Sequence, residues 1–117
     1  MTGASFGAVL ESLSRVRGVR VSLVVAASDG IVVESITQVG QETAKVAALA
    51  ASLYGKARKA SEAAGFGWTG FFQMEAERGR LCAIGGEELL LVVIADREAN
   101  VGLIRVEMLR AAEALSS

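Results

Sequence analysis

The chain has 117 residues, 52% of them hydrophobic, and a net charge of −1, a balance that predicts one folded domain spanning 1–117. That charge offers no field for attracting nucleic acid, and no apolar run reaches the roughly 20 residues of a membrane-spanning helix, so we expect a cytoplasmic protein. With no histidine and one cysteine, the sequence excludes Ser-His-Asp and Cys-His catalysis and an internal disulfide, and we expect neither a metal nor another cofactor.

The first part of the chain reads as a helix followed by a hairpin. Apolar residues at helical spacing predict a helix over 5–17. Two strands are expected at 19–27 and 31–36, joined by Asp29-Gly30, a dipeptide typical of two-residue hairpin turns in which both residues have positive φ. The first strand is apolar almost throughout, which indicates burial on both faces and an internal place in the sheet.

A long helix and a three-stranded meander follow. The helix is predicted over 41–64, where Gly65 supplies its stop. The strands of the meander are expected at 67–76, 80–85 and 88–95, and the short turns between them require antiparallel neighbours. The last strand is apolar throughout, which favours a central position.

Asn100 is placed to cap a final helix that runs to about Leu115. The complete order is then α-β-β-α-β-β-β-α. A five-stranded antiparallel sheet with the middle helix on one face and the N- and C-terminal helices on the other would bury the apolar side of every element. The sequence therefore predicts an α+β domain of this architecture.

Four segments together resemble the roadblock (dynein light-chain) family, and most closely its bacterial branch of MglB-type regulators. They are GVRVSLVVAASDGIVVES, the alanine-rich helix ending in AAG, FFQMEAERGRLCAIGGEELLLVVIAD and NVGLIRVEMLRAAEAL. The resemblance runs from Phe6 to Leu115. It rests on the ordered set of segments rather than on one diagnostic motif.

This resemblance implies both an assembly and a function. Family members are homodimers in which the third strands pair edge to edge and the middle helices pack against each other. Many bind small Ras-like GTPases, and the MglB-type members accelerate GTP hydrolysis without an obvious catalytic centre of their own. We therefore expect two partners for this chain, a second copy of itself and a small GTPase.

The middle helix is unusually rich in small residues, and a glycine in its centre costs about 0.5–1 kcal/mol relative to alanine. One interpretation is plain packing of a strong helix former on the sheet. The other is close contact with the same helix of a second copy, with Leu49 and Leu53 holding the opposite side to the sheet. The residues expected in this self-contact are Ala47, Ala51, Tyr54 and Gly55.

Polar residues occupy another side of the same helix. A charged helix face is usually solvated, but in this family it is also the surface on which a GTPase would dock. The residues expected at such a partner surface are Lys45, Ser52, Lys56 and Lys59.

The third strand holds half of the six aromatic residues of the chain. Trp68, Phe71 and Phe72 could belong to the core. Alternatively, the strand is an edge that pairs with its copy, because it has no proline or lysine to protect it from association. In that case these three residues contribute to the dimer interface.

The remaining chemical groups favour ordinary structural roles. Glu75 and Glu77 could suggest acid–base chemistry, but the neighbouring arginines suit a solvated turn. Arg78 is conceivable as an arginine finger, although such a residue is not characteristic of the family. Cys82 lies among apolar residues and is expected to be buried and inert.

Three functional hypotheses follow from the sequence. The leading one is a non-enzymatic homodimer that binds a small Ras-like GTPase and stimulates its GTP hydrolysis. The second is a dimeric adaptor that leaves nucleotide turnover unchanged. The third, a small-ligand sensor, would need a pocket lined with polar groups.

Overall fold

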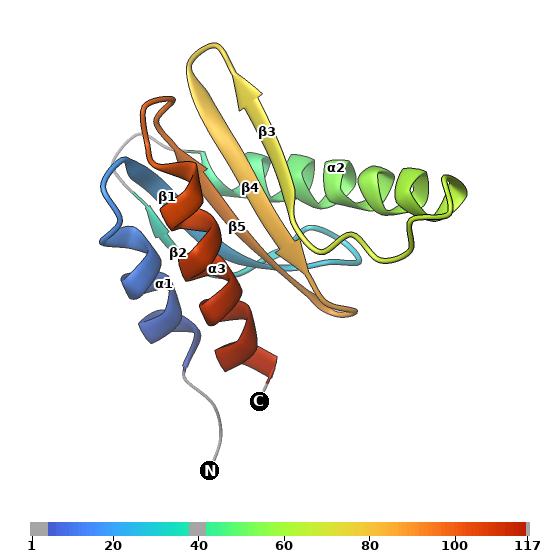
Figure 1. The fold of residues 1–117 in the computed structure, drawn as a ribbon. Helices are drawn as coiled ribbons and strands as arrows, with labels where there is room; N and C mark the ends of the chain where they lie inside the picture. Colours follow the sequence, from blue (N-terminus) through green and yellow to red (C-terminus); the bar gives the residue numbers. More distant parts are fainter. Residues whose placement is uncertain (1–4, 38–41, 117) are drawn as a thin grey trace.

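The computed structural model describes residues 5–37 and 42–116, in the predicted order of helices and strands (Figure 1). Residues 38–41, which hold most of the predicted connection before the middle helix, lie outside this description. The helices are α1 (Phe6–Ser14), α2 (Thr43–Ala63) and α3 (Val101–Ser116). The strands are β1 (Val19–Ala26), β2 (Val32–Thr37), β3 (Phe72–Ala76), β4 (Gly79–Gly85) and β5 (Leu89–Ala95).

All five strands form one antiparallel sheet in the order β2-β1-β5-β4-β3. The two most apolar strands, β1 and β5, lie inside the sheet as their composition predicts. The two edges are β2 and β3, so the third strand is an edge strand as the second interpretation of its aromatic residues required.

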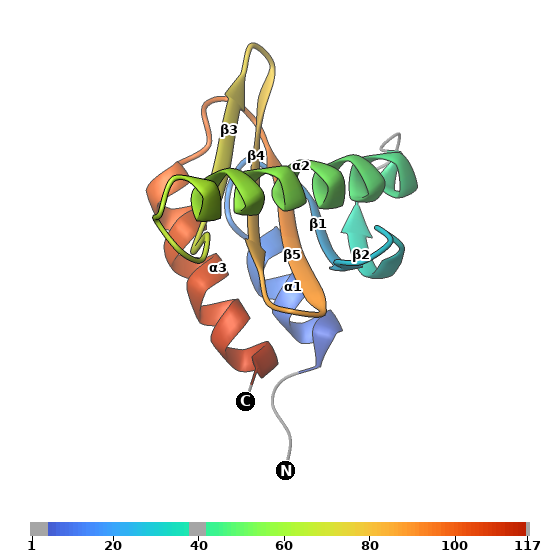
Figure 2. The same ribbon diagram turned by 90° about the vertical axis from the view of Figure 1, so that its right-hand side faces the viewer.

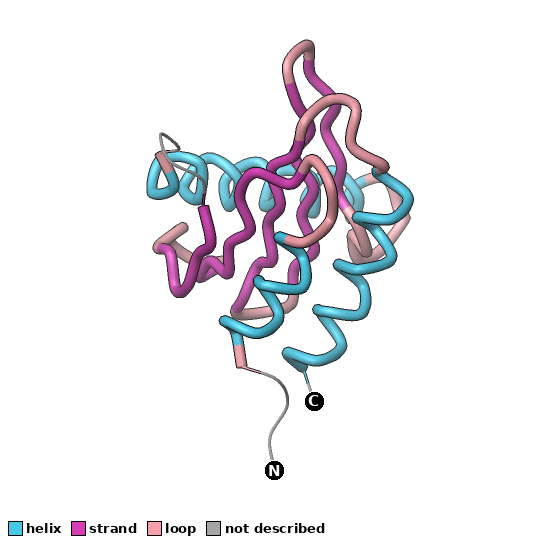
Figure 3. The backbone as a smooth tube through the Cα atoms, turned by 90° about the vertical axis from the view of Figure 1, so that its left-hand side faces the viewer, coloured by secondary structure: helices cyan, strands magenta, loops and turns pink. Residues whose placement is uncertain are grey.

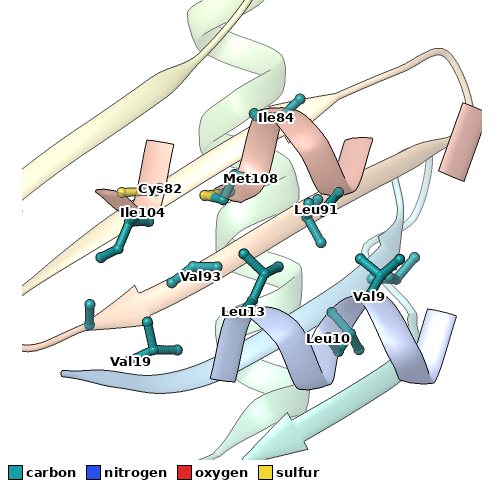
Figure 4. Close-up of a cluster of buried hydrophobic side chains, with 13 residues drawn as sticks. Val9, Leu10, Leu13, Val19, Cys82, Ile84, Leu91, Val93, Ile104 and Met108 are labelled. Atoms are coloured by element: carbon teal, nitrogen blue, oxygen red, sulfur yellow. The ribbon is translucent and has the colours of Figure 1, made fainter. Parts of the chain in front are cut away.

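The helices cover the two faces of the sheet as predicted. Helices α1 and α3 lie side by side on one face, and α2 crosses the strands on the other (Figures 2 and 3). The larger core lies under α1 and α3 (Figure 4). Its largest fully buried members include Leu10, Leu13, Ile104 and Met108. Cys82 is buried in the same cluster, as expected.

The core under α2 is smaller. Alternate residues of β1, namely Val21, Leu23 and Val25, point to this side, as the period of a strand requires. They meet Leu90 and Val92 of the neighbouring β5. Because β1 and β5 have apolar residues on both sides, the sheet can bury both of its faces.

A buried serine ties α1 to the sheet. The Ser22 hydroxyl is fully buried on β1 and donates to the carbonyl oxygen of Leu10 at 3.2 Å. It also lies 2.8 Å from the Ser14 hydroxyl. These bonds satisfy a polar group that would otherwise be costly to bury.

The start of the third strand and the length of the first hairpin turn differ from the prediction. Strand β3 begins at Phe72 rather than at 67, because the segment before it bonds to α2 instead of to β4. The first hairpin turn is also longer than two residues. Its amide at Gly30 donates to Ala26 O at 2.9 Å, and only Gly30 has a positive φ, +74°.

The ends of the terminal helices follow local capping rules. At α3 the Asn100 Oδ1 atom accepts from the Leu103 amide at 3.1 Å, which confirms the predicted cap. The predicted end of this helix near Leu115 agrees with the structure, although that side chain lies outside the described residues. At the other end of the chain, Ser5 caps α1, which stops at Ser14 rather than at 17.

Candidate functional site

Helix α2 contacts the sheet through a face that the sequence assigned elsewhere. Ala47, Ala50 and Tyr54 are buried on this face. Ala47 and Tyr54 were predicted to meet a second copy, and that prediction is wrong because both side chains are covered by the protomer itself. Leu49, predicted to face the sheet, is 61% exposed, and Leu53 is only partly covered.

Tyr54 fixes the position of α2. Its hydroxyl donates to Thr69 O at 2.9 Å and also reaches Gly85 O at 3.3 Å. The ring lies so close to Gly85 that a Cβ atom there would be 2.4 Å from the ring, which explains glycine at this position. Burial raises the pKa of the Tyr54 hydroxyl, outweighing the opposing effects of the Gly85 bond and Arg58.

The other two residues of the expected self-contact have different surroundings. Ala51 is half-buried, and its Cβ lies near Gly30 in the β1–β2 turn. Gly55 has open space where a side chain would be, because no atom beyond its chain neighbours and the adjacent backbone of its own helix lies within 4 Å of the position that a Cβ would take. Within this chain, therefore, nothing requires glycine at position 55.

The predicted partner residues share one exposed side of α2. Lys45, Ser52, Lys56 and Lys59 are all exposed, and helical geometry places them on the side opposite the sheet. The structure adds Leu49 to this face. These five residues define the outward face of α2. Leu49 is its apolar centre, and the residues around it are polar or positively charged.

Helix α2 ends in a motif that sends the chain back toward β3. Gly65 has a positive φ, its amide bonds to Glu62 O, and the amide of Phe66 bonds to Ser61 O, a Schellman arrangement. Phe66 is 81% exposed at the end of the helix, which extends past β3 in Figure 1. Phe66 is not among the predicted site residues, although an aromatic residue between two glycines was a usable signal in the sequence.

The aromatic residues of the β3 region divide between the two faces of the sheet. Phe72 packs on the α2 side. Phe71 packs on the opposite side, with the guanidinium of Arg105 5.3 Å from its ring centroid. Trp68 remains exposed before the strand, and the Arg58 guanidinium stacks 3.9 Å above its ring. Each aromatic thus lies near the edge of the sheet.

The charged hairpin after β3 is a surface feature. Glu75 pairs with Arg80 at 3.2 Å and with Arg97 at 3.8 Å, while Glu77 and Arg78 lie almost fully in solvent.

Burial raises the pKa of the Cys82 thiol, which disfavours the reactive thiolate.

A shallow hollow of about 460 Å³ lies between the turn that follows α1 and the turn that precedes α3. The polar groups that line it include Arg17, Asp96 and Asn100. Asp96 pairs with Arg20, and Asn100 caps α3. Two of the polar groups that a small ligand would need are therefore already engaged.

Residues 5–37 and 42–116 contain no group of three side chains suited to holding a metal ion. None of the helices in those ranges is long and apolar enough to cross a bilayer. Two exposed surfaces carry predicted site residues, namely the outward face of α2 and the β3 edge.

A five-stranded antiparallel sheet between one central and two terminal helices is the roadblock fold. A Roadblock/LC7 domain model matches residues 6–95, and the chain belongs to the Roadblock/LC7 domain family. An uncharacterized protein of Methanocaldococcus jannaschii, MJ1340, is 33% identical over 93% of this chain and 95% of its own length.

Two solved structures show the same likeness. A Roadblock/LC7 domain from Streptomyces avermitilis matches 97% of this chain over 96% of its own, with a TM-score of 0.85 and 22% identity. The gliding protein MglB from Thermus thermophilus matches 93% of this chain over 84% of its own, with a TM-score of 0.82 and 25% identity. The relatives therefore come from both archaea and bacteria.

Proposed function

We propose that this protein is a homodimeric regulator that binds a small Ras-like GTPase and stimulates its GTP hydrolysis without a catalytic residue of its own. The main support is the likeness to MglB over nearly the whole chain. The predicted partner residues, Lys45, Ser52, Lys56 and Lys59, are exposed together on α2, which is the accessibility that such a role requires.

The two edges of the sheet differ in a way that supports pairing through β3. In the pairing of β1 with β2, Val24 lies opposite Glu34 and Val25 opposite Val32, so Val33 is the extra residue of a bulge on β2. A bulge is a device that protects an edge from association. Strand β3 has a regular register with β4 from Phe72 to Ala76. Its outer side is the better template for a second copy.

The end of α2 provides a second argument for a dimer. Residues 62–68 are all exposed, including Phe66 and Trp68, and they adjoin the β3 edge. A segment with two exposed aromatic residues has more apolar surface than a solvated helix end needs. A second protomer paired through β3 would lie next to this segment and could cover it.

Regulation by such a dimer would be indirect. The two outward faces of α2 would hold the GTPase in the conformation in which its own nucleotide-binding residues are ordered. Ordering of this kind lowers the barrier by positioning rather than by supplying a new group. The alternative is a dimeric adaptor that binds the GTPase and leaves its GTP hydrolysis unchanged. The curated relative, an uncharacterized protein, does not distinguish the two.

The test is GTP hydrolysis by a Ras-like GTPase from the same genome, measured with and without this protein. We expect faster hydrolysis and tighter binding of the state loaded with a GTP analogue than of the GDP state. Equal affinity for both states and unchanged turnover would favour the adaptor. No detectable binding to any such GTPase in either state would contradict both.

A further inference from the structure

Leu49 is the one large apolar residue of α2 that is exposed. It is 61% exposed in the outward face, with Lys45 one turn before it and Ser52 one turn after it. A leucine at this position makes no large contribution to the fold, because most of its side chain is in water. Burying an apolar side chain is favourable, and Leu49 can still make most of this contribution in a complex.

The lysines of this protein are all in the same place. The chain has three lysines, at 45, 56 and 59, and its other nine basic residues are arginines. All three lysines are exposed on the outward face of α2. The ion pairs seen in the described part of the chain use arginines, and none of them uses a lysine.

Between its first and last lysine this face carries no negative charge, and the nearest carboxylate before Lys45 is Glu42 at the N-cap of α2. No aspartate or glutamate occurs between Lys45 and Lys59. At about 1.5 Å per residue, Lys45 lies about 6 Å before Leu49 along the helix axis, and Lys56 and Lys59 lie about 10 and 15 Å after it. The lysines therefore form a positive border around an apolar centre in a protein whose net charge is −1.

We propose that Leu49 is the apolar anchor of this surface and that its occupant is an apolar patch on the GTPase bordered by carboxylates. The inference rests on the proposed function and specifies the chemistry of the partner. The lysines would attract the carboxylates at long range, and Leu49 would be desolvated on contact. In protein interfaces of this kind the buried centre supplies most of the affinity, and the charged rim mainly sets the association rate.

Other occupants fit this surface less well. A second copy docked face to face would bring the lysines of both chains together, which is unfavourable at short range. The phosphates of a nucleic acid would be matched better by the planar fork of arginine, and a nucleic acid offers no apolar pocket for a leucine. A lipid surface would need a broad apolar helix face, and the outward face of α2 has only one large apolar residue, Leu49. An apolar patch bordered by carboxylates on the partner would match both Leu49 and the lysines of this face.

The test uses Leu49→Ala and Leu49→Glu in a titration against the GTPase loaded with a GTP analogue. We expect the dissociation constant to rise about 10-fold for Leu49→Ala and about 100-fold or more for Leu49→Glu. Leu103→Glu is the matched control, because Leu103 is 45% exposed on α3 at the opposite side of the sheet. It should leave the affinity unchanged, and circular dichroism should show all three variants folded.

The lysines are tested by Lys56→Glu combined with Lys59→Glu. We expect a drop of about 10-fold in association rate at low salt, and a much smaller drop near 0.5 M salt, where the Debye length is only about 4 Å. Arg15→Glu combined with Arg17→Glu reverses the same charge near α1 and should have little effect.

Each other outcome has a distinct meaning. Wild-type binding that Leu49→Glu leaves intact would overturn the anchor while keeping the proposed function. Light scattering that shows Leu49→Glu as a monomer would assign the face to a second copy and also overturn it. Binding to phosphatidylserine vesicles or to an oligonucleotide, with no binding to the GTPase, would overturn both the anchor and the proposed function.

Discussion

Tyr54 connects three separate segments through one side chain. Its ring fills the space beside Gly85 at the end of β4, and its hydroxyl bonds to the loop that precedes β3. The loop therefore takes its position from α2 rather than from the sheet. Because the same loop carries Trp68, this tyrosine also sets where the exposed aromatic residues lie relative to the β3 edge.

We predict that Tyr54→Phe lowers the free energy of unfolding by about 1–2 kcal/mol at neutral pH, because the carbonyl of Thr69 loses its donor. Urea denaturation followed by circular dichroism measures the change. The chain has one tyrosine, so tyrosinate absorbance can follow the same group in the wild type. A variant as stable as the wild type would mean that water replaces the hydroxyl without cost.

The same residue gives a pH dependence of known sign. Burial raises the pKa of Tyr54 in the folded state above the ordinary value of about 10. The stabilisation from the neutral phenol is thus complete below the unfolded pKa and is lost as the pH rises through the folded pKa. We expect wild-type stability to fall above about pH 10 more steeply than that of Tyr54→Phe. Parallel curves would contradict this.

At the level of elements, the sequence predicts which segments form helices and strands better than it predicts how a helix is turned. Unbroken apolar runs correctly predicted that β1 and β5 lie inside the sheet, because such runs can be buried only on both faces. Helix α2 is alanine-rich on several sides, so hydrophobicity pointed to Leu49 and Leu53 as its contacts with the sheet. Contact instead uses Ala47 and Ala50.

The reason for this rotation is steric. The β1–β2 turn approaches α2 so closely that a Cβ at Gly30 would lie 2.9 Å from the Cα of Ala48. Only small side chains fit such an approach, and the larger Tyr54 packs farther along the helix, beside Gly85. A contact that depends on the glycine of a distant turn cannot be read from the periodicity of the helix itself. Leu49, the residue missed as a site, was missed for the same reason.

The two edge strands supply a matched pair of variants. Met74 is 41% exposed on β3 and Val33 is 44% exposed on β2. We predict that Met74→Lys raises the dimer dissociation constant at least 10-fold, because a charge on a pairing edge disfavours association. Val33→Lys should leave it unchanged, because the bulge already keeps that edge free.

Analytical ultracentrifugation over a concentration series measures both variants. Thermal unfolding of each variant shows whether the monomer fold is intact. Equal weakening by the two substitutions would mean that the β3 edge has no special role. A wild-type protein that is monomeric at tens of micromolar would remove the homodimer from the proposal altogether.

At the scale of the whole molecule, the two proposed contacts differ in their physics. The self-contact through β3 and the end of α2 would bury apolar and backbone groups, with Phe66 and Trp68 nearby. The partner contact would use the three lysines and Leu49 on the outward face of α2. In a dimer the lysines of two protomers would share one side of the assembly and repel each other.

Salt should therefore change the two contacts in opposite directions. Between about 50 and about 500 mM sodium chloride the Debye length falls about threefold, so lysine–carboxylate attraction and lysine–lysine repulsion both weaken. We predict that affinity for the GTPase drops about 10-fold over this range, while the dimer stays as tight or becomes tighter. Parallel titrations of one preparation, by sedimentation for the dimer and by fluorescence anisotropy for the GTPase, measure both constants. If the two constants rise together with salt, the self-contact is itself electrostatic, and the division of surfaces between β3 and α2 is wrong.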